Sequence, residues 1–394
     1  MADSATRTAS PVDVPALRER EFPHVGRAPY LNAASMGPLP ERARHALDAY
    51  NLRRSRIHEM RGDDFDPTLE RARAAAARLV NATPGEIALM PNTSHGLNLA
   101  AQCLPIEPGR RVVVSDQEFP ANVYPWAAIA QEGRARVDVV PGDALGRPDR
   151  DRLMEELDRG DVGIFALSAV QFATGWLADL PAFGRACREH GTWFVVDAIQ
   201  ACGCVPIDVR EAGVDILATG GHKWLCGPFG TGFAYLRRGL VERIEPRTVG
   251  WTAMKASADY ADCCAYRWEL VDDARRFEVA TQPFQDVAAF TRSLELLLEV
   301  GQENVHAHVL SILDPLAEWL AGRDEAVIVS DLHPARRSGI FAFRFGDTAK
   351  AYGALHRAGV QCVLREGAIR LSPHLYNTAE DVAAVIGVLE RGGW

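Results

Sequence analysis

Short apolar runs alternate with amphipathic stretches through the middle of the chain. The runs that predict buried strands are residues 111–115, 163–168, 193–196, 216–218 and 232–236. Between them, residues 92–103, 151–158 and 180–190 carry the spacing of amphipathic helices. Continuous apolar strands separated by helices are typical of a mostly parallel sheet that helices cover on both faces.

The pattern changes after residue 282. Helical stretches, a strand candidate and a hairpin follow, at residues 287–300, 305–321, 338–345, 348–358, 361–371 and 378–391. The 394 residues are enough for two domains. We therefore expect an N-terminal tail or arm (1–20), a large domain (21–282) and a smaller C-terminal α+β domain (283–394).

Composition narrows the classes of partner. The net charge of −9 argues against nucleic-acid and anionic-membrane partners, which bind basic surfaces. No apolar run approaches the ~20 residues that cross a bilayer, and the first ten residues lack the apolar stretch of a secretory signal. The eight cysteines are scattered and their close pairs lack a second pair at zinc spacing, so we expect reduced thiols, a cytoplasmic protein and no metal site.

Two segments carry the candidate chemistry. Asp197 directly follows an apolar strand in VVDAIQ (195–200), and Lys223 follows another in TGGHK (219–223). Alone, such an aspartate is usually a helix cap and such a lysine a surface residue. Ligands of parallel sheets bind at the carboxyl ends of strands, which makes the combination more informative. A lysine amine and a carboxylate suit pyridoxal 5′-phosphate (PLP), whose aldehyde and pyridine nitrogen need them.

The sequence resembles the class V aminotransferase family, which includes cysteine desulfurases, kynureninases and isopenicillin-N-epimerase-like proteins. The resemblance runs from YLN (30–32) to LYNT (375–378) and includes both segments above. It implies PLP as cofactor and fold type I, with a mostly parallel sheet in the large domain. It also implies that Lys223 is the catalytic Schiff-base lysine, that Asp197 partners the pyridinium nitrogen and that Gln200 donates to the phenolic oxygen.

The same resemblance assigns the remaining cofactor contacts. Thr93 and Ser94 open a predicted helix and are similar to the phosphate cradle, as helix N-termini bind anions. His222 is similar to a histidine that also reaches the phosphate. Phe119, in EFPAN (118–122), stands where a flat side chain stacks on the ring. Thr281 ends a segment that crosses to a partner subunit, which implies a homodimer with its site at the interface.

The implied substrate is a small amino acid. Arg370 is similar to the arginine that binds the α-carboxylate, a task that suits a guanidinium. Asn32 and Ala33 resemble the turn that lines the substrate pocket. Two features depart from the family. Gly220 replaces a phosphate-binding serine, and residues 365–370 leave no loop for the cysteine of desulfurases.

The reaction stays open within a short list. A PLP-stabilised carbanion leads to epimerisation, transamination or β-elimination. Because the loop cysteine is absent and we interpret Cys362 as buried and inert, we expect an isopenicillin-N-epimerase-like lyase, epimerase or transaminase. The alternatives are a cysteine desulfurase or selenocysteine-lyase-like enzyme that uses a remote cysteine, a kynureninase-like hydrolase, and a non-catalytic binding protein of the same fold. The sequence does not identify the substrate side chain.

Overall fold

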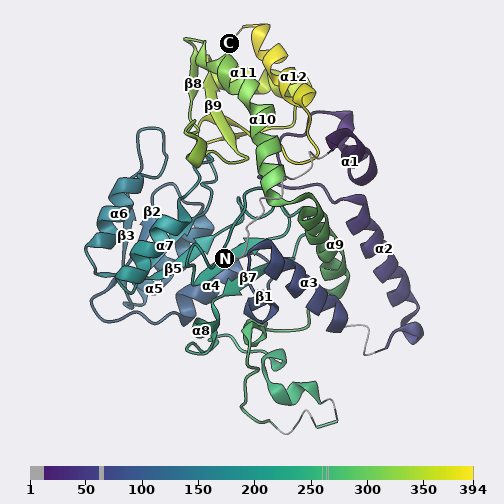
Figure 1. Ribbon diagram of the computed structural model, residues 1–394, viewed down its shortest axis with the longest axis vertical. Coiled ribbons are helices and arrows are strands. Elements are labelled where there is room, and N and C mark those ends of the chain that lie inside the picture. Colours follow the sequence, from purple (N-terminus) through teal and green to yellow (C-terminus); the bar gives the residue numbers. More distant parts are fainter. Residues whose placement is uncertain (1–12, 62–65, 260, 263, 265, 394) are drawn as a thin grey trace, which may run out of the picture.

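A computed structural model describes residues 13–61, 66–259, 261–262, 264 and 266–393 (Figure 1). Its helices are α1 (Val14–Glu21), α2 (Glu41–Ser55), α3 (Asp66–Leu79), α4 (Thr93–Cys103), α5 (Tyr124–Gln131), α6 (Arg150–Asp158), α7 (Leu180–Glu189), α8 (Arg238–Val241), α9 (Phe284–Val300), α10 (Gln302–Ala321), α11 (Thr348–Arg357) and α12 (Ala379–Glu390). Its strands are β1 (Ile87–Leu89), β2 (Arg111–Ser115), β3 (Arg136–Val140), β4 (Val162–Ser168), β5 (Trp193–Asp197), β6 (Ile216–Gly220), β7 (Gly232–Leu236), β8 (Ala326–Ile328), β9 (Phe341–Phe345), β10 (Val363–Arg365) and β11 (Ala368–Leu371).

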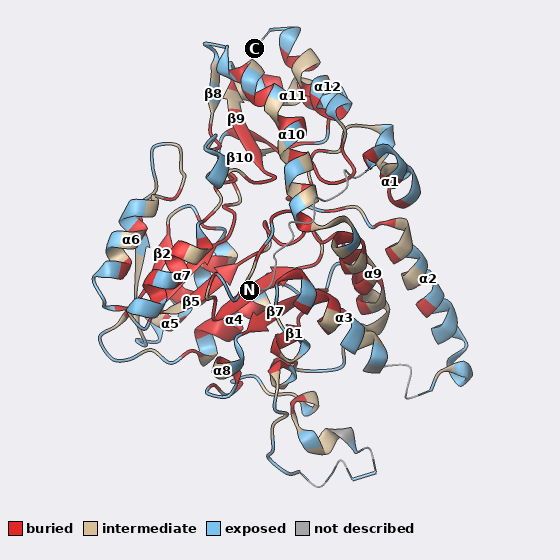
Figure 2. Cartoon of the chain, in the orientation of Figure 1, coloured by how far each residue is buried: buried red, intermediate tan, exposed pale blue. Residues whose placement is uncertain are grey.

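The larger sheet has the strand order β1-β7-β6-β5-β4-β2-β3. Strands β3, β2, β4, β5 and β6 pair in parallel, whereas β7 and β1 are antiparallel to their neighbours. Every residue of β2, β4, β6 and β7 is buried, as Figure 2 shows for the centre of the sheet. Burial on both faces explains why these strands read as continuous apolar runs, and the predicted mostly parallel sheet is confirmed.

The smaller sheet is antiparallel, with the order β10-β11-β9-β8. It lies beside α11 and α12 at the C-terminal end of the molecule (Figure 1). Strands β10 and β11 form a hairpin whose two-residue turn is Glu366 and Gly367, with φ of 44° and 73°. Both positive φ values are typical of the tight turns that join twisted strands. The hairpin predicted at 361–371 is therefore present.

Two helices bear on the predicted domain division. Helix α9, which the boundary at 283 assigns to the C-terminal domain, packs against α2 and α3. Helix α1 lies in the predicted N-terminal arm, and Arg18 forms an ion pair of 3.3 Å with Asp381 of α12. Residues 1–12 of that arm lie outside the described residues. The exact division into domains stays a prediction.

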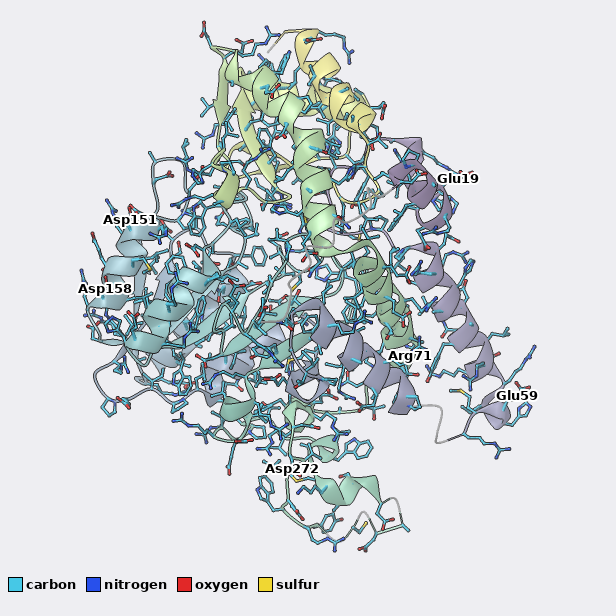
Figure 3. The ribbon with its side chains drawn as sticks, viewed as in Figure 1. Glu19, Glu59, Arg71, Asp151, Asp158 and Asp272 are labelled. Atoms are coloured by element: carbon cyan, nitrogen blue, oxygen red, sulfur yellow. The ribbon has the colours of Figure 1, made fainter. Side chains whose placement is uncertain are left out.

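The periphery of the molecule carries many of its charges. Figure 3 labels six such exposed residues, namely Glu19, Glu59, Arg71, Asp151, Asp158 and Asp272. Among the described residues, no helix has the length and apolar character needed to cross a membrane.

Candidate active site

The carboxyl ends of β5 and β6 bring the two principal candidates to one edge of the sheet. Asp197 is the last residue of β5 and pairs in register with Ala218 of β6. Strand β6 ends at Gly220, and Lys223 follows three residues later. The Asp197 side chain is 2% exposed, and its Oδ1 accepts a hydrogen bond from the Ile199 amide (2.9 Å). Asp197 and Lys223 attract each other electrostatically, as the effect of each on the other's pKa shows.

Burial shifts the pKa values of both groups toward pH 7, because it disfavours their charged forms. It lowers the pKa of Lys223 to about 8, although the nearby Asp197 carboxylate opposes the shift. A lysine with this pKa has a useful neutral fraction near pH 7, which a nucleophilic amine requires. Burial also raises the pKa of Asp197 to about 6, so this carboxyl group remains mostly ionised at neutral pH.

Phe119 forms an aromatic surface next to Lys223. The Lys223 Nζ lies 5.5 Å from the centroid of the Phe119 ring. Phe172 contacts the same ring edge-on, with centroids 5.4 Å apart. Phe119 is nevertheless 44% exposed, so part of its ring remains open to a ligand.

The N-terminus of α4 offers an anion site. The Asn92 side chain caps the helix by accepting from the His95 amide (3.0 Å). Thr93 is buried, yet its Oγ1 has no hydrogen-bond partner among the described residues, whereas Ser94 is exposed. Gly96 sets the position of the helix, because a Cβ atom there would lie 2.7 Å from the Cβ of Ala218. The glycine thus allows α4 to contact β6 closely and places its N-terminal amides at the same sheet edge.

Gln200 and His222 lie at the carboxyl ends of the same two strands. Gln200 Nε2 donates to the Ala34 carbonyl (3.1 Å), and its Oε1 accepts from Trp224 Nε1 (2.8 Å). One amide hydrogen therefore remains for another acceptor. His222 stacks on Phe229, with centroids 5.2 Å apart, and burial lowers the pKa of its imidazole. A Cβ at Gly220 would lie 3.3 Å from His222 Nδ1, so a serine at this position would crowd the imidazole ring where it now lies.

Arg370 is a buried cation that forms no ion pair with any carboxylate of the described residues. It is 2% exposed on β11, where Nη1 donates to the Phe172 carbonyl (2.7 Å) and Nη2 to Ser35 Oγ (2.9 Å). Its Nε has no partner, and no carboxylate of the described residues lies within ion-pair distance. Burial lowers the pKa of the guanidinium. A buried charge is stable when it is paired, so this position favours an anionic ligand.

The N-terminal turn lies against this arginine. Asn32 Oδ1 is buried without a hydrogen-bond partner, while Ala33 is fully buried and its amide donates to the Ser372 carbonyl (3.0 Å). Ser35, which the sequence reasoning missed, contacts Arg370 directly. Its place at the end of the segment NAAS (32–35), which contains Asn32 and Ala33, was the available signal. No sequence signal pointed to Phe172.

Glu118 is a second missed residue. It precedes Phe119 and is buried, and its carboxylate accepts from the Ser168 amide (2.8 Å), from Ser168 Oγ and from Asn122 Nδ2 (3.2 Å). Ser168 pairs in register with Asp197. Burial, with a smaller effect of Asp197, raises the pKa of Glu118 to about 7. The carboxylate therefore fixes the segment that carries Phe119 to the end of β4.

A Glu118→Gln variant should be less stable than the wild type. The amide presents NH₂ to donors that need an acceptor, and an unsatisfied buried group costs about 1–3 kcal/mol. Urea unfolding followed by tryptophan fluorescence measures the difference. Gln117→Glu, at the neighbouring exposed position, is the control. Equal stability of Glu118→Gln and wild type would contradict this role.

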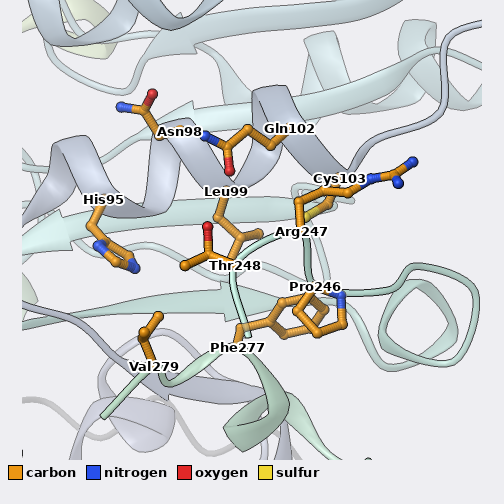
Figure 4. A pocket seen from close by; sticks show the side chains of 10 residues that line it. All are labelled: His95, Asn98, Leu99, Gln102, Cys103, Pro246, Arg247, Thr248, Phe277 and Val279. Atoms are coloured by element: carbon orange, nitrogen blue, oxygen red, sulfur yellow. The ribbon is translucent and has the colours of Figure 1, made fainter. Parts of the chain in front are cut away.

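The segment that leads to Thr281 passes beside α4. His95 and Leu99 of α4 face Phe277 and Val279 there (Figure 4). The pocket that they line has a volume of about 210 Å³. Beyond Val279 the chain becomes exposed at Thr281. Within a single chain, no hydrogen bond of the described residues ties the Thr281 side chain to the site.

The described cysteines are free thiols, and most of them are buried. Cys362 is 3% exposed, and burial raises its pKa to about 12, which disfavours a thiolate. Cys264 is exposed, whereas Cys263 lies outside the described residues. Within the described ranges, no three His, Cys, Asp or Glu side chains gather as metal ligands would.

Comparisons with known proteins agree with this geometry. A family model described as aminotransferase class-V matches residues 30–385. The chain is 30% identical to cysteine desulfurase CsdA of Escherichia coli, over 96% of this chain and 97% of the relative. It is 25% identical to isopenicillin N epimerase of Streptomyces clavuligerus, over 91% and 94%. The structure of a cysteine desulfurase from Thermococcus onnurineus NA1 superposes with a TM-score of 0.86 at 21% identity, covering 97% of this chain and 98% of that one.

The site residues fit PLP, the cofactor that this family match indicates. The unpartnered Thr93 Oγ1 at a helix N-terminus matches a phosphate, and the buried Asp197 carboxylate at a strand end matches a pyridinium nitrogen. Lys223 has the lowered pKa that an aldehyde-binding amine needs. The fold is that of the fold type I PLP-dependent transferases.

Proposed function

Because the chain belongs to the class V aminotransferase family, we propose that it acts at the α-carbon or β-position of a small amino acid, with Lys223 holding PLP. The observation that carries the proposal is the placement of Lys223 and Asp197 at adjacent strand ends, with an unpaired Arg370 nearby. Electrostatic repulsion from Arg370 contributes to the lowered pKa of Lys223, so the two cations share one site. A substrate carboxylate would neutralise that pair.

Each side chain has a distinct task in this proposal. Bound PLP supplies an electron sink for charge that develops at the substrate α-carbon. Asp197 holds the proton on the pyridine nitrogen, and Phe119 restricts the orientation of the ring. Thr93, Ser94 and His222 bind the phosphate, and Gln200 donates its remaining amide hydrogen to the phenolic oxygen.

Proton transfer and substrate orientation fall to two residues. With cofactor and substrate bound, the Lys223 Nζ would serve as the general base and acid for the α-proton. Arg370 binds the α-carboxylate, and Asn32 and Ala33 line the pocket beside it.

The reaction that we propose is of the isopenicillin-N-epimerase-like type, a lyase, epimerase or transaminase. The turn between β10 and β11 consists of Glu366 and Gly367 only, so it cannot carry a nucleophilic cysteine. Cys362, one residue before β10, is buried and resists ionisation. A desulfurase would require a thiolate within reach of the substrate sulfur.

Product analysis distinguishes these reactions. The PLP-saturated enzyme is incubated with single L-amino acids in D₂O. Racemised and deuterated amino acid indicates an epimerase, and stoichiometric conversion of the cofactor to its amine form indicates a transaminase. Catalytic release of pyruvate together with ammonia indicates a β-eliminating lyase. Failure of every amino acid to exchange its α-proton would contradict the proposal.

Cysteine desulfurase remains the second candidate, since relatives such as CsdA carry that name. Cys264 is an exposed thiol and is the candidate acceptor for this reaction. Alkylation of the enzyme after turnover with ³⁵S-cysteine traps a persulfide, and Cys264→Ser tests its location. Anthranilate release from kynurenine tests the hydrolase alternative.

An Arg370→Lys variant should bind its amino-acid substrate more weakly. Lysine keeps the charge, but its single nitrogen lacks the planar fork that reaches Phe172 and Ser35 and pairs two N–H groups with a carboxylate, so KM should rise about tenfold to a hundredfold. Ser35→Ala removes only one contact of the guanidinium and should raise KM less. Steady-state kinetics measures both variants. An unchanged KM in Arg370→Lys would assign the carboxylate to another group.

A homodimer completes the proposed site. Thr281 contributes to the phosphate site of the partner subunit. Tyr266 and Trp268 are 87% and 73% exposed on the segment that projects at the lower end of Figure 1, and exposed aromatic groups are typical of interfaces. Light scattering should give about twice the chain mass of 43.1 kDa. A monomer that binds PLP and turns over substrate would contradict this arrangement.

A further inference from the structure

A large cavity lies at the sheet edge opposite the active site. It has a volume of about 790 Å³ and is lined by residues at the amino ends of β4 and β5 and by the residues before β6 and after β7. Because β7 is antiparallel, its carboxyl end reaches the same edge. Two acidic residues, Glu107 and Asp215, line the cavity together with five arginines, Arg110, Arg188, Arg210, Arg237 and Arg243.

The positive charge of this lining is only partly cancelled, since Arg237 pairs with Asp215 (2.8 Å) and Arg210 lies 4.0 Å from Glu86. Asp215 is buried, and it already accepts from the Phe194 amide (2.9 Å) and from Arg237 Nε (2.8 Å). In the part of the chain that the structure describes, Arg188 and Arg243 have no carboxylate within ion-pair distance. These guanidinium groups gather in a concavity of a protein whose net charge is −9. The cluster is therefore local and not a result of a generally basic surface.

Packing holds three of the arginines in position. Arg188 Nη1 lies 1.3 Å from the point where a Cβ at Gly213 would be, so the absence of a side chain at Gly213 makes room for the guanidinium. Arg243 lies over Trp193, 5.4 Å from the ring centroid. Arg110 donates to the carbonyls of His190 (2.7 Å) and Gly191 (3.1 Å).

The hydrogen bonds of Arg110 make the cavity more favourable for an anion. His190 and Gly191 follow α7, and the carbonyls at a helix C-terminus repel negative charge. Arg110 neutralises them, while Arg188 and Arg243 keep free donors for a ligand. Guanidinium groups bind phosphate and carboxylate groups through paired hydrogen bonds.

We propose that this cavity binds a small polyanion with two or more phosphate or carboxylate groups. Its volume is within the range of small-molecule sites, about 300–1,000 Å³. The concave shape fits a small ligand better than a nucleic acid or a membrane, which need an extended basic surface. The site is separate from the cofactor phosphate site and does not depend on the reaction proposed above.

Calorimetric titration of the PLP-saturated enzyme tests the proposal, since the cofactor already fills its own phosphate site. The probes are inorganic tripolyphosphate and citrate, with monovalent chloride at matched ionic strength. The test variant is Arg188→Gln/Arg243→Gln. The control is Arg185→Gln, an exposed arginine on the same helix that does not line the cavity.

Saturable binding of either polyanion, weakened about tenfold or more in the double variant and unchanged in Arg185→Gln, supports the site. The probe that binds identifies phosphate or carboxylate as the preferred group. Failure of both probes to bind, or equal weakening in the control, overturns the proposal. Unchanged thermal unfolding of the double variant shows that it is folded, and an unchanged visible spectrum shows that the cofactor is not displaced.

Discussion

A Lys223→Ala variant should retain the fold, lose the covalently held cofactor and lose at least about a thousandfold in turnover. The variant loses two functions at once, since the same amine binds the aldehyde and transfers the α-proton. The buried pocket should tolerate alanine, because burial already disfavours the charged form of this amine. Visible absorption and mass spectrometry after borohydride reduction measure the covalent link.

The chain supplies unusually clean controls for this experiment. Its sequence contains only three lysines, Lys223, Lys255 and Lys350. Lys255 forms ion pairs with Glu269 and Asp272, and Lys350 with Asp347, so both ammonium groups are held on the surface. Lys255→Ala and Lys350→Ala should keep the reduced cofactor. A label on either surface lysine, or a covalent link that survives in Lys223→Ala, would refute the assignment.

An Asp197→Asn variant should be catalytically impaired, yet more stable without cofactor. Loss of the carboxylate removes the partner of the pyridine nitrogen, and we expect a loss of about a hundredfold or more in turnover. In the cofactor-free protein, burial raises the pKa of Asp197 from 3.8 to about 6. A shift of that size corresponds to about 3 kcal/mol of unfavourable ionisation. Asparagine keeps an oxygen that accepts from the Ile199 amide.

The pH dependence fixes the sign of this effect. Below pH 3.8 the carboxyl is protonated in both the folded and the unfolded chain, so its ionisation does not affect the free energy of unfolding. As the pH rises from 3.8 to about 6, the unfolded chain ionises while the folded chain stays protonated, so the wild type progressively loses stability relative to Asp197→Asn. Above about pH 6 the carboxyl ionises in both states and the difference stays constant. Urea unfolding of both cofactor-free proteins, at pH values from 3.8 to about 6, measures the difference in their free energies of unfolding. A difference that does not change with pH would exclude ionisation of Asp197 as its cause.

Much of the central sheet could be predicted from sequence, for a physical reason. Strands buried on both faces form unbroken apolar runs, and the predicted 111–115 and 232–236 coincide with β2 and β7. Strand β3 was missed because it lies at the sheet edge, where only Val140 is fully buried and polar residues interrupt the pattern. Strand β1 was missed because it has only three residues.

The candidate site divides in the same way. Asp197, Lys223 and Thr93 follow directly from strand ends and a helix start, which local patterns reveal. Glu118, Ser35 and Phe172 depend on contacts between distant segments, such as the bond between Arg370 and Ser35. Phe172 acts through its carbonyl and its ring edge, and neither property distinguishes it from an ordinary apolar residue.

The turn at residues 31–37 joins segments from nearly opposite ends of the chain. Leu31 and Ala33 donate to the carbonyls of Gln361 and Ser372, and Gly37 donates to the carbonyl of His222. During synthesis, the substrate side of the pocket therefore cannot assemble until the last strands have emerged from the ribosome. A nascent chain that stops before residue 361 would lack the partners of Leu31 and Ala33, so the substrate side of the pocket must form after the cofactor side, whose residues lie between 93 and 281.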